Sequence, residues 1–422
     1  MKRPENCNGP NSRQAMGLLF GAWFSLSWTL LLPLAAMEPQ DQQASVEPPP
    51  LGVPRELRED EVQAGWLELF DGETLQGWKN EGDANFVVQE GRIVADTGTA
   101  PCLLRTTTQF DDYELTVDFR FTETTNSGVF LRTPPTPTNP TVDCFEVNIA
   151  QPTVSPFPTG SLVGREANPI ELDTDQWHRM SMTIQGGSLR VIVDGERITQ
   201  VDSATPVGRG YIGLQYNAGR VEFCNVFVQP LHPNDQPPQD LSLWRIGPTP
   251  DSLTIDGDVE SGFTLSDGVG YVESQERFGD FLWRGSVRTH QPGVNSGVFF
   301  RCIPGSDLNG YESQIQNEII DGDPARPVDH GTGGIFRRMP ARQVWSKDET
   351  WFAMTIIAEG AHFAVWVEGR QVVDWTDERP ADENPRRGRR IESGTLALQL
   401  HDAGTAVSFR DILARELVKR RK

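Results

Sequence analysis

The chain has 422 residues, which is long enough for two domains that each bury a core. Its 59 acidic and 38 basic side chains give a formal net charge of −21, which argues against a nucleic-acid partner, because such partners require a basic surface. The same charge disfavours a polyanionic polysaccharide and is compatible with a neutral or cationic partner.

Residues 1–36 have the layout of a secretory signal peptide. Lys2, Arg3 and Arg13 precede an almost wholly apolar stretch that begins at Ala15, and the sequence becomes polar after residue 36. We expect cleavage near residue 36 and export to the periplasm, the cell surface or the medium. The alternative is an uncleaved anchor, because about 20 apolar residues also span a bilayer. A membrane is expected as a partner only in that case.

Composition divides the rest of the chain into folded and linking segments. Residues 37–64 are rich in Pro, Gln and Glu and are expected to be a disordered linker, with a short helix within residues 55–64. Proline is dense again in a second linker. The expected segments are a first domain at 65–229, a Pro-rich linker at 230–240, a second domain at 241–417 and a basic tail at 418–422.

Strand patterns dominate both domains. Residues 115–121 alternate between apolar and polar side chains, with the period of two expected when one face of a sheet is buried. Residues 188–197 predict a hairpin, because the Asp-Gly pair at its centre supplies the positive φ angles of a tight turn. No segment shows a convincing helical period. Together with 40 glycines and 31 prolines, these patterns predict an all-β protein with one β-sandwich in each domain.

One stretch occurs twice and indicates a tandem duplication. Asn-Ser-Gly-Val-Phe-Leu-Arg at residues 126–132 recurs as Asn-Ser-Gly-Val-Phe-Phe-Arg at residues 295–301. Further matches follow in the same order, with spacings that drift as loop insertions require: residues 145–149 with 311–315, 159–162 with 332–335, 193–195 with 367–369, and 210–215 with 394–399.

The cysteines leave two possibilities open. Cys102, Cys144 and Cys224 lie in the first copy and Cys302 in the second, and no CxxC spacing typical of a metal site is present. An exported protein oxidises one pair among the first three, or all remain buried thiols that pack as small apolar groups.

These ordered elements resemble the family of 3-keto-disaccharide hydrolase domains, long known as domain of unknown function 1080. The resemblance rests on the opening Leu-Phe-Asp-Gly and Gly-Trp of residues 69–78, the Asn-Ser-Gly-Val-Phe strand, the Tyr-Glu-x-Gln-Ile strand of residues 311–315, the Thr-Gly turn and the final strand that ends in Gln. It covers residues 66–228 and 241–416. It implies two concanavalin A-like jelly rolls, export, and action on carbohydrates by hydrolysis of 3-ketoglycosides.

The second copy is the better candidate for catalysis. Residues 399–402 read Gln-Leu-His-Asp, which matches the family pattern of Gln, one residue and His, whereas residues 215–217 of the first copy read Gln-Tyr-Asn. The first copy, however, keeps more of the opening motif.

A carboxylate and an amide recur on one strand of each copy. Because Phe145, Val147 and Ile149 alternate towards the core, Glu146 and Asn148 are expected to share the opposite face. By the same phase Glu312 and Gln314 share a face in the second copy. In a jelly roll this face is often a concave sugar groove, where such a pair suits a hydroxyl clamp or a general base. A solvated polar face is the alternative.

Other candidates surround this pair. His401 is a catalytic candidate beside Asp402, which is placed to orient the imidazole ring. Arg337 and Trp345, with the neighbouring Arg338 and Arg342, suit a sugar subsite or equally an exposed basic patch. Further substrate-binding candidates are the arginines that end the repeated stretch, Arg132 and Arg301.

The sequence establishes no cofactor, and one loop contains possible ligands of a divalent cation. Asp321, Asp323, Asp329 and His330 offer carboxylate and imidazole groups, but their spacing fits no standard site. An ordinary turn-rich loop is therefore favoured.

The resemblance implies a mechanism in which a ketone at C3 acidifies the hydrogen on C2 and permits β-elimination at C1. This route requires a base, an enolate stabiliser and an acid for the leaving group. Glu312 or His401 as the base, with Arg337 or a metal at the enolate, is the hypothesis for an exported enzyme. The alternative is a tandem carbohydrate-binding protein without catalysis, since a fold alone does not fix function.

Overall fold

A computed structural model describes residues 49–99, 101–168, 170–202, 208–231, 244–247, 253–258 and 261–419. The predicted signal peptide, most of the Pro-rich linker and the last three residues of the basic tail lie outside these ranges. The described residues belong to one compact unit. The helices within the described ranges are all too short or too polar to cross a membrane.

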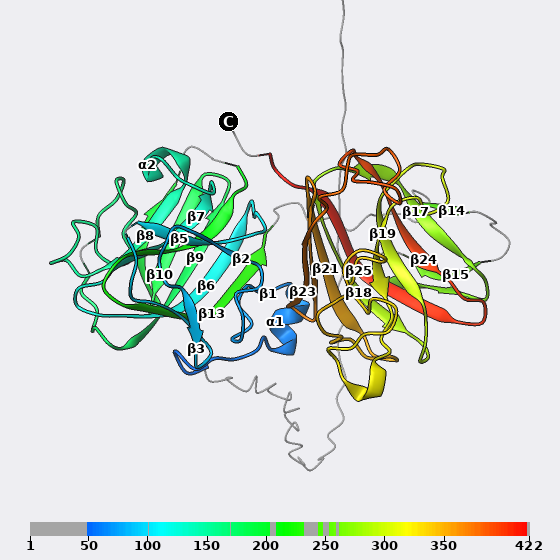
Figure 1. Ribbon diagram of the computed structural model, residues 1–422, viewed down its shortest axis with the longest axis horizontal. Coiled ribbons are helices and arrows are strands. Elements are labelled where there is room, and N and C mark those ends of the chain that lie inside the picture. Colours follow the sequence, from blue (N-terminus) through cyan, green and yellow to red (C-terminus); the bar gives the residue numbers. More distant parts are fainter. Residues whose placement is uncertain are drawn as a thin grey trace, which may run out of the picture. The chain divides into compact units, whose positions relative to one another are not determined.

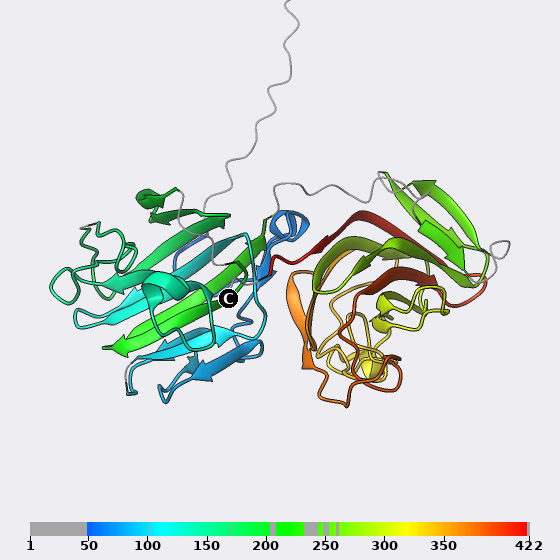
Figure 2. The same ribbon diagram turned by 90° about the horizontal axis from the view of Figure 1, so that it is seen from above.

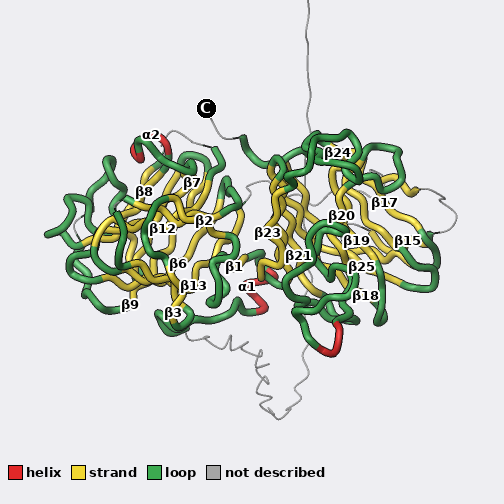
Figure 3. Tube along the Cα trace, in the orientation of Figure 1, coloured by secondary structure: helices red, strands yellow, loops and turns green. Residues whose placement is uncertain are grey.

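The regular structure of the first copy is almost entirely strand, drawn in yellow in Figure 3. Its two sheets have the strand orders β11-β10-β9-β6-β13-β4-β3, with β1 also paired to β13, and β2-β5-β12-β7-β8. The strands are β1 (Leu67–Glu68), β2 (Trp78–Glu81), β3 (Val87–Gln89), β4 (Arg92–Ala95), β5 (Cys102–Thr106), β6 (Tyr113–Phe121), β7 (Asn126–Thr133), β8 (Phe145–Ala150), β9 (Trp177–Gln185), β10 (Ser188–Val193), β11 (Glu196–Val201), β12 (Tyr211–Ala218) and β13 (Val221–Pro230). The helices are α1 (Glu59–Gln63) and α2 (Pro140–Asp143).

The second copy repeats this arrangement (Figure 1). Its sheets have the orders β14-β17-β24-β19-β20 and β15-β16-β25-β18-β21-β22-β23. The strands are β14 (Trp244–Gly247), β15 (Thr254–Asp258), β16 (Gly262–Ser266), β17 (Gly270–Phe278), β18 (Phe281–Thr289), β19 (Ser296–Cys302), β20 (Tyr311–Ile315), β21 (Phe352–Glu359), β22 (His362–Val367), β23 (Arg370–Thr376), β24 (Gly394–Leu400) and β25 (Ala406–Glu416), with the 3-10 turn η3 (Ile320–Gly322). Each half is thus a jelly-roll β-sandwich, and the duplicated stretch forms the equivalent strands β7 and β19.

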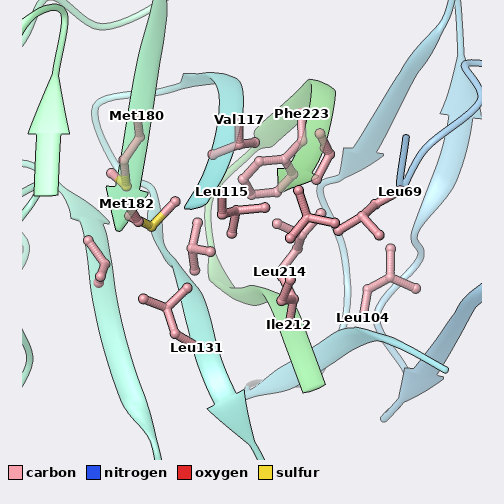
Figure 4. Packing of buried hydrophobic residues seen from close by; sticks show 14 of the residues in the cluster. Leu69, Leu104, Leu115, Val117, Leu131, Met180, Met182, Ile212, Leu214 and Phe223 are labelled. Carbon is pink, nitrogen blue, oxygen red and sulfur yellow. The ribbon is translucent and has the colours of Figure 1, made fainter. Parts of the chain in front are cut away.

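Apolar side chains from both sheets of each copy fill the space between the layers that Figure 2 shows. In the first copy, Leu115 and Val117 from β6 meet Leu131 from β7 and Leu214 from β12 (Figure 4). The alternation predicted for residues 115–121 is therefore confirmed, since all four of its apolar side chains are buried. Burial of these apolar surfaces, at about 25 cal/mol per Å², is the main stabilising term.

The predicted hairpin turns are also present. Asp194 and Gly195 have φ angles of 50° and 83°, and Glu368 and Gly369 have 53° and 74°. These positive values match the right-handed twist of the strands that each turn joins.

The prediction of a disordered linker is wrong for residues 49–64. The Gly52 N–H donates to Asp118, and the Arg55 N–H donates to Asn225, so this segment is fixed to the first sandwich. The short helix predicted there is α1.

Buried contacts also join the two copies. The Arg415 guanidinium donates two hydrogen bonds to the Asp111 carboxylate, at 2.7 and 2.8 Å, and the Trp366 indole donates to the Glu68 carbonyl. Both partners of the ion pair are less than a tenth exposed. The contact is therefore a packed interface and not a loose approach of two surface loops.

The described cysteines are all thiols. Cys102, Cys144, Cys224 and Cys302 are buried and unpaired, so the interpretation as small apolar groups applies to the structure.

The two arginines of the repeated stretch, predicted to bind substrate, are instead buried structural residues. Arg301 is fully buried, and it donates to the carbonyls of Gly279, Gly360 and Arg390. Arg132 likewise donates to the carbonyls of two loops. Positive φ angles of 51° and 54° at the two arginines turn their side chains into the interior, which the pattern of a strand does not reveal.

We predict that Arg301→Met lowers the free energy of unfolding by about 2–4 kcal/mol, because buried carbonyls lose their donors. Urea unfolding followed by tryptophan fluorescence measures this change. The control is Arg326→Met, which removes an exposed pair with Asp321 and should cost less than about 1 kcal/mol. Equal effects of the two substitutions would contradict the structural role of Arg301.

Candidate functional site

A cavity of about 370 Å³ lies in the second copy, on the face of the β14-β17-β24-β19-β20 sheet that points away from the sandwich core. Glu312 and Gln314 of β20 point into it, whereas Tyr311 and Ile315 pack in the core. The shared face predicted for the carboxylate and the amide is therefore present. The cavity is lined by Asn295, Phe299, Leu308, Gly310, Tyr311, Glu312, Gln314, Phe336, Arg337, Arg338, Pro385, Arg386, Gln399 and His401.

The repeated Asn-Ser-Gly segment organises one wall of this cavity. Asn295 accepts a hydrogen bond from Gln314 Nε2 at 3.1 Å, and Ser296 Oγ donates to the Gln399 carbonyl at 2.5 Å. A Cβ atom at Gly297 would lie only 2.8 Å from Glu312 Oε1. Each residue of the segment thus positions a different polar group, and the glycine leaves space for the carboxylate.

Two amide oxygens in the cavity wall lack a donor. The Oε1 atoms of Gln314 and Gln399 are buried, and they accept no hydrogen bond from any described residue. Gln314 Nε2 also approaches Asp329 at 3.3 Å, which fixes the orientation of its amide. Buried acceptors without partners are uncommon and suit the hydroxyl groups of a sugar.

The environment of Glu312 favours its protonated form near neutral pH. Burial raises the pKa of this carboxyl to about 8, and the negative charge of Asp329 acts in the same direction. Arg386 and Arg337 partly oppose the shift by stabilising the carboxylate. A carboxyl group whose pKa lies near the working pH is suited to proton transfer.

His401 lies at the end of β24 and lines the same cavity. Its Nδ1 is 2.8 Å from Asp402 Oδ1, as the adjacent residues predicted. Asp402 does not line the cavity, so it would affect a ligand only through the imidazole of His401. Glu312 and His401, far apart in sequence, are thus brought together by the fold.

Arginines form one rim of the cavity. Arg337 and Arg338 lie in the turn after residues 332–335, and Arg386 comes from the loop between β23 and β24. Arg337 has a φ angle of 59°, at the position that Gly164 occupies in the first copy with a φ angle of 70°. A left-handed conformation costs a side-chain-bearing residue about 1–2 kcal/mol, so the exchange of glycine for arginine has a structural cost.

Trp345 does not contribute to this cavity. It lines a different cavity of about 300 Å³ that is bordered by residues of both copies, and the guanidinium of Arg370 covers its ring at 3.7 Å from the centroid. Arg342 pairs with Asp71 at the same place. The prediction that Trp345 and Arg337 share a sugar subsite is therefore wrong.

The candidate metal ligands do not converge. Asp321 is exposed and pairs with Arg326, whereas Asp329 faces Gln314. Asp323 accepts a hydrogen bond from the Ala325 N–H, and His330 packs against Phe336. No group of three or more His, Cys, Asp or Glu side chains within the described ranges is placed to hold a metal ion.

The equivalent pair in the first copy is satisfied by its neighbours. Glu146 accepts from Gln215 Nε2 at 3.1 Å, and Asn148 donates to the Phe157 carbonyl. Both side chains are less than a tenth exposed. The residue equivalent to His401 is Asn217, so the first copy lacks this imidazole.

Sequence reasoning missed Asn295, Gln399 and Arg386 as cavity residues. The first two lie in matched stretches of the duplication, so their recurrence was a usable signal. Arg386 belongs to an insertion without a counterpart in the first copy, and no pattern placed that loop over β20.

Several solved structures resemble part of this chain at low sequence identity. A putative glycosyl hydrolase from Parabacteroides distasonis is 18% identical, with a TM-score of 0.38, covering 42% of this chain and 100% of that one. A second from the same organism is 20% identical, with a TM-score of 0.33, covering 41% and 99%. Carbohydrate-binding module CBM66 from Bacillus subtilis is 12% identical, with a TM-score of 0.29, covering 36% and 95%. At such TM-scores these likenesses carry no argument about the cavity.

A search of curated proteins gave no match. The model of the 3-keto-alpha-glucoside-1,2-lyase-like domain, in contrast, matches residues 65–229 and 236–415. Because these two segments make up most of the chain, the protein belongs to this family and contains two copies of its domain.

Proposed function

We propose that the second copy cleaves the glycosidic bond of 3-ketoglycosides in the cavity that holds Glu312. The observation that carries this proposal is the position of a carboxyl group with a pKa of about 8 beside unsatisfied amide acceptors and an imidazole. Membership of the lyase-like family supports the reaction class. Export of the protein, expected from its N-terminal residues, is part of the same proposal.

The chemistry is a β-elimination. The base removes the hydrogen on C2, which the ketone at C3 has acidified, and the electron pair forms an enolate. The enolate then expels the oxygen on C1, so that a C1–C2 double bond forms while the C1–O bond breaks. The leaving oxygen takes up a proton. Addition of water to the unsaturated product would complete a net hydrolysis.

Each step has a candidate group in the cavity. Ionised Glu312 is the base, and Arg337 provides positive charge for the enolate oxygen. His401, which Asp402 orients, is placed to protonate the leaving oxygen. Gln314 and Gln399 accept hydrogen bonds from sugar hydroxyls and hold C2 towards the base.

The second candidate function is sugar binding without cleavage. The open Oε1 acceptors of Gln314 and Gln399 favour it equally, because they would hold an unoxidised sugar as well. Saturable binding without turnover of any 3-ketoglycoside would select this function.

We predict that Glu312→Gln lowers turnover of a chromogenic 3-ketoglucoside by about 10²–10⁴-fold, because the general base is lost. Release of the leaving group measures the rate. Glu146→Gln, the same change in the first copy, should leave the rate within about twofold. Full activity of the Glu312 variant would reject the assignment, and equal losses in both variants would point to a defect of the common fold.

The pH dependence tests the same group. As the base acts when ionised, kcat/KM should rise with pH through about 8, the pKa of Glu312 in the free protein. Asp329→Asn should move this limb to lower pH, because the negative charge of Asp329 raises the pKa of Glu312. Asp321→Asn, an exposed change in the same loop, is the control. A limb that stays in place in the Asp329 variant would contradict Glu312 as the titrating base.

Gly297→Ala tests the space that the carboxylate needs. The new methyl group would meet Glu312 Oε1, so we expect the side chain to move and kcat to fall by about 10²-fold, with little change in the unfolding midpoint. Gly128→Ala in the first copy is the matched control and should retain activity. If the variant lost activity while its crystal structure showed Glu312 in place, this explanation would be contradicted.

A further inference from the structure

We propose that Arg338 and Arg386 form an anion subsite at the rim of the cavity, which takes a carboxylate or sulfate substituent of the bound sugar. The inference deepens the proposed function, since it assumes a sugar in the same cavity. It identifies the substrate class as an acidic glycoside.

The first argument is an excess of positive charge. Elimination develops one negative charge, which Arg337 is placed to stabilise, yet Arg338 and Arg386 line the same cavity. No carboxylate lies within ion-pair distance of any of the three guanidinium groups in the described part of the chain. Glu312, the acidic side chain of the lining, is held towards its neutral form because burial raises its pKa to about 8.

This local charge is opposite to that of the whole molecule. The chain has a formal charge of −21, because its 59 acidic side chains outnumber the 38 basic ones. Overall charge disfavours a polyanion at long range, whereas a single acidic group that enters the cavity meets only the arginines of the rim.

The second argument is the way the rim is built. Arg338 donates to the carbonyls of Arg337 and Arg386, both at 2.9 Å, and Arg386 donates to the Leu308 carbonyl. These bonds to backbone carbonyls fix the two guanidinium groups, which line the same cavity. Burial and the nearby charge of Arg379 lower the pKa of Arg338, so the cluster has a cost that a bound anion would relieve.

The loop that carries Arg386 is specific to the second copy. Residues 377–393 connect β23 to β24, whereas the equivalent connection in the first copy is only residues 202–210. After the duplication, the second copy therefore gained the longer loop or the first copy lost it. The longer loop supplies Pro385 and Arg386 to the cavity.

The loop is also rigidly held. Arg379 makes two hydrogen bonds of 2.8 Å with the Asp377 carboxylate, and its Nη2 donates to the carbonyls of Pro385 and Gly388. The Tyr311 hydroxyl donates to the same carboxylate. Such contacts fix the backbone beside Arg386 before a ligand arrives, which reduces the entropy lost on binding.

The acidic residues of the loop do not neutralise Arg386. Asp377 pairs with Arg379, Asp382 with Arg387 and Glu392 with Arg390, and neither Glu378 nor Glu383 forms an ion pair with Arg386. Asp329 accepts a hydrogen bond from Gln314 Nε2, and its negative charge acts on Glu312. An acidic substituent is thus expected at the rim and not beside Glu312. Guanidinium groups suit this role because they bind carboxylate and sulfate oxygens through paired N–H donors.

Binding of three unoxidised probes tests the inference: methyl glucoside, methyl glucuronide and methyl glucoside 6-sulfate. We expect one or both anionic probes to bind at least about tenfold more tightly than the neutral probe, with a preference that weakens as salt is raised. The better anion identifies the substituent. Calorimetry or ligand-observed NMR with the whole protein measures the dissociation constants.

Arg386→Gln should reduce this preference to about twofold or less, since the exposed cation of the rim is removed. Arg387→Gln removes an equal charge from the same loop but lies outside the cavity lining, and it should keep the preference. An equal reduction in both variants would show general electrostatic attraction and overturn the subsite.

Equal affinity for all three probes, preference for the neutral one, or no binding of either anion at about 20 mM would also overturn it. The test is separable from the proposed function, because it uses sugars that cannot undergo elimination. A preference for anions without turnover of 3-ketoglucosides would leave the subsite in place and remove the lyase.

Discussion

The absence of a side chain at Gly297 is the constraint on which the cavity depends. β19 lies between β24 and β20, so any atom on its outer face separates Gln399 from Glu312. With glycine there, the Glu312 carboxylate occupies the space beside Gly297, while Ser296 and Asn295 hold the adjacent carbonyl and amide. The repeated sequence is therefore the same in both copies at the positions where the backbone of this strand limits the placement of the cavity side chains.

The same arrangement has a thermodynamic cost. Since burial raises the pKa of Glu312 from 4.5 to about 8, the folded state binds more protons than the unfolded state between these values. Stability contributed by this group is complete below about 4.5 and falls as the pH rises to about 8. The ionised base is thus formed at the expense of folding free energy, which the apolar core between the two sheets offsets.

Much of the fold was predictable because β-structure has a period of two and the duplication supplies each pattern twice. The shared face of Glu312 and Gln314 follows from that period alone. Arg301 and Trp345 were misplaced for physical reasons that no pattern contains. A left-handed φ angle turns Arg301 inward, and Trp345 packs under Arg370 of its own copy and lines a different cavity. Arg386 was missed because a loop is placed by tertiary contacts.

Equivalent strands of the two copies place their polar side chains in different environments. In the first copy Glu146 accepts from Gln215 Nε2 and Asn148 donates to the Phe157 carbonyl, whereas Gln215 Oε1, the equivalent of Gln399 Oε1, is buried without a donor. In the second copy the amide of Gln314 is held by Asn295 and its oxygen is left open. A buried acceptor without a donor is unfavourable for folding and is retained where a ligand supplies the donor. Because Gln399 Oε1 has an open counterpart in the first copy, Gln314 Oε1 is the acceptor that favours a ligand specifically in the second copy, independently of which reaction follows.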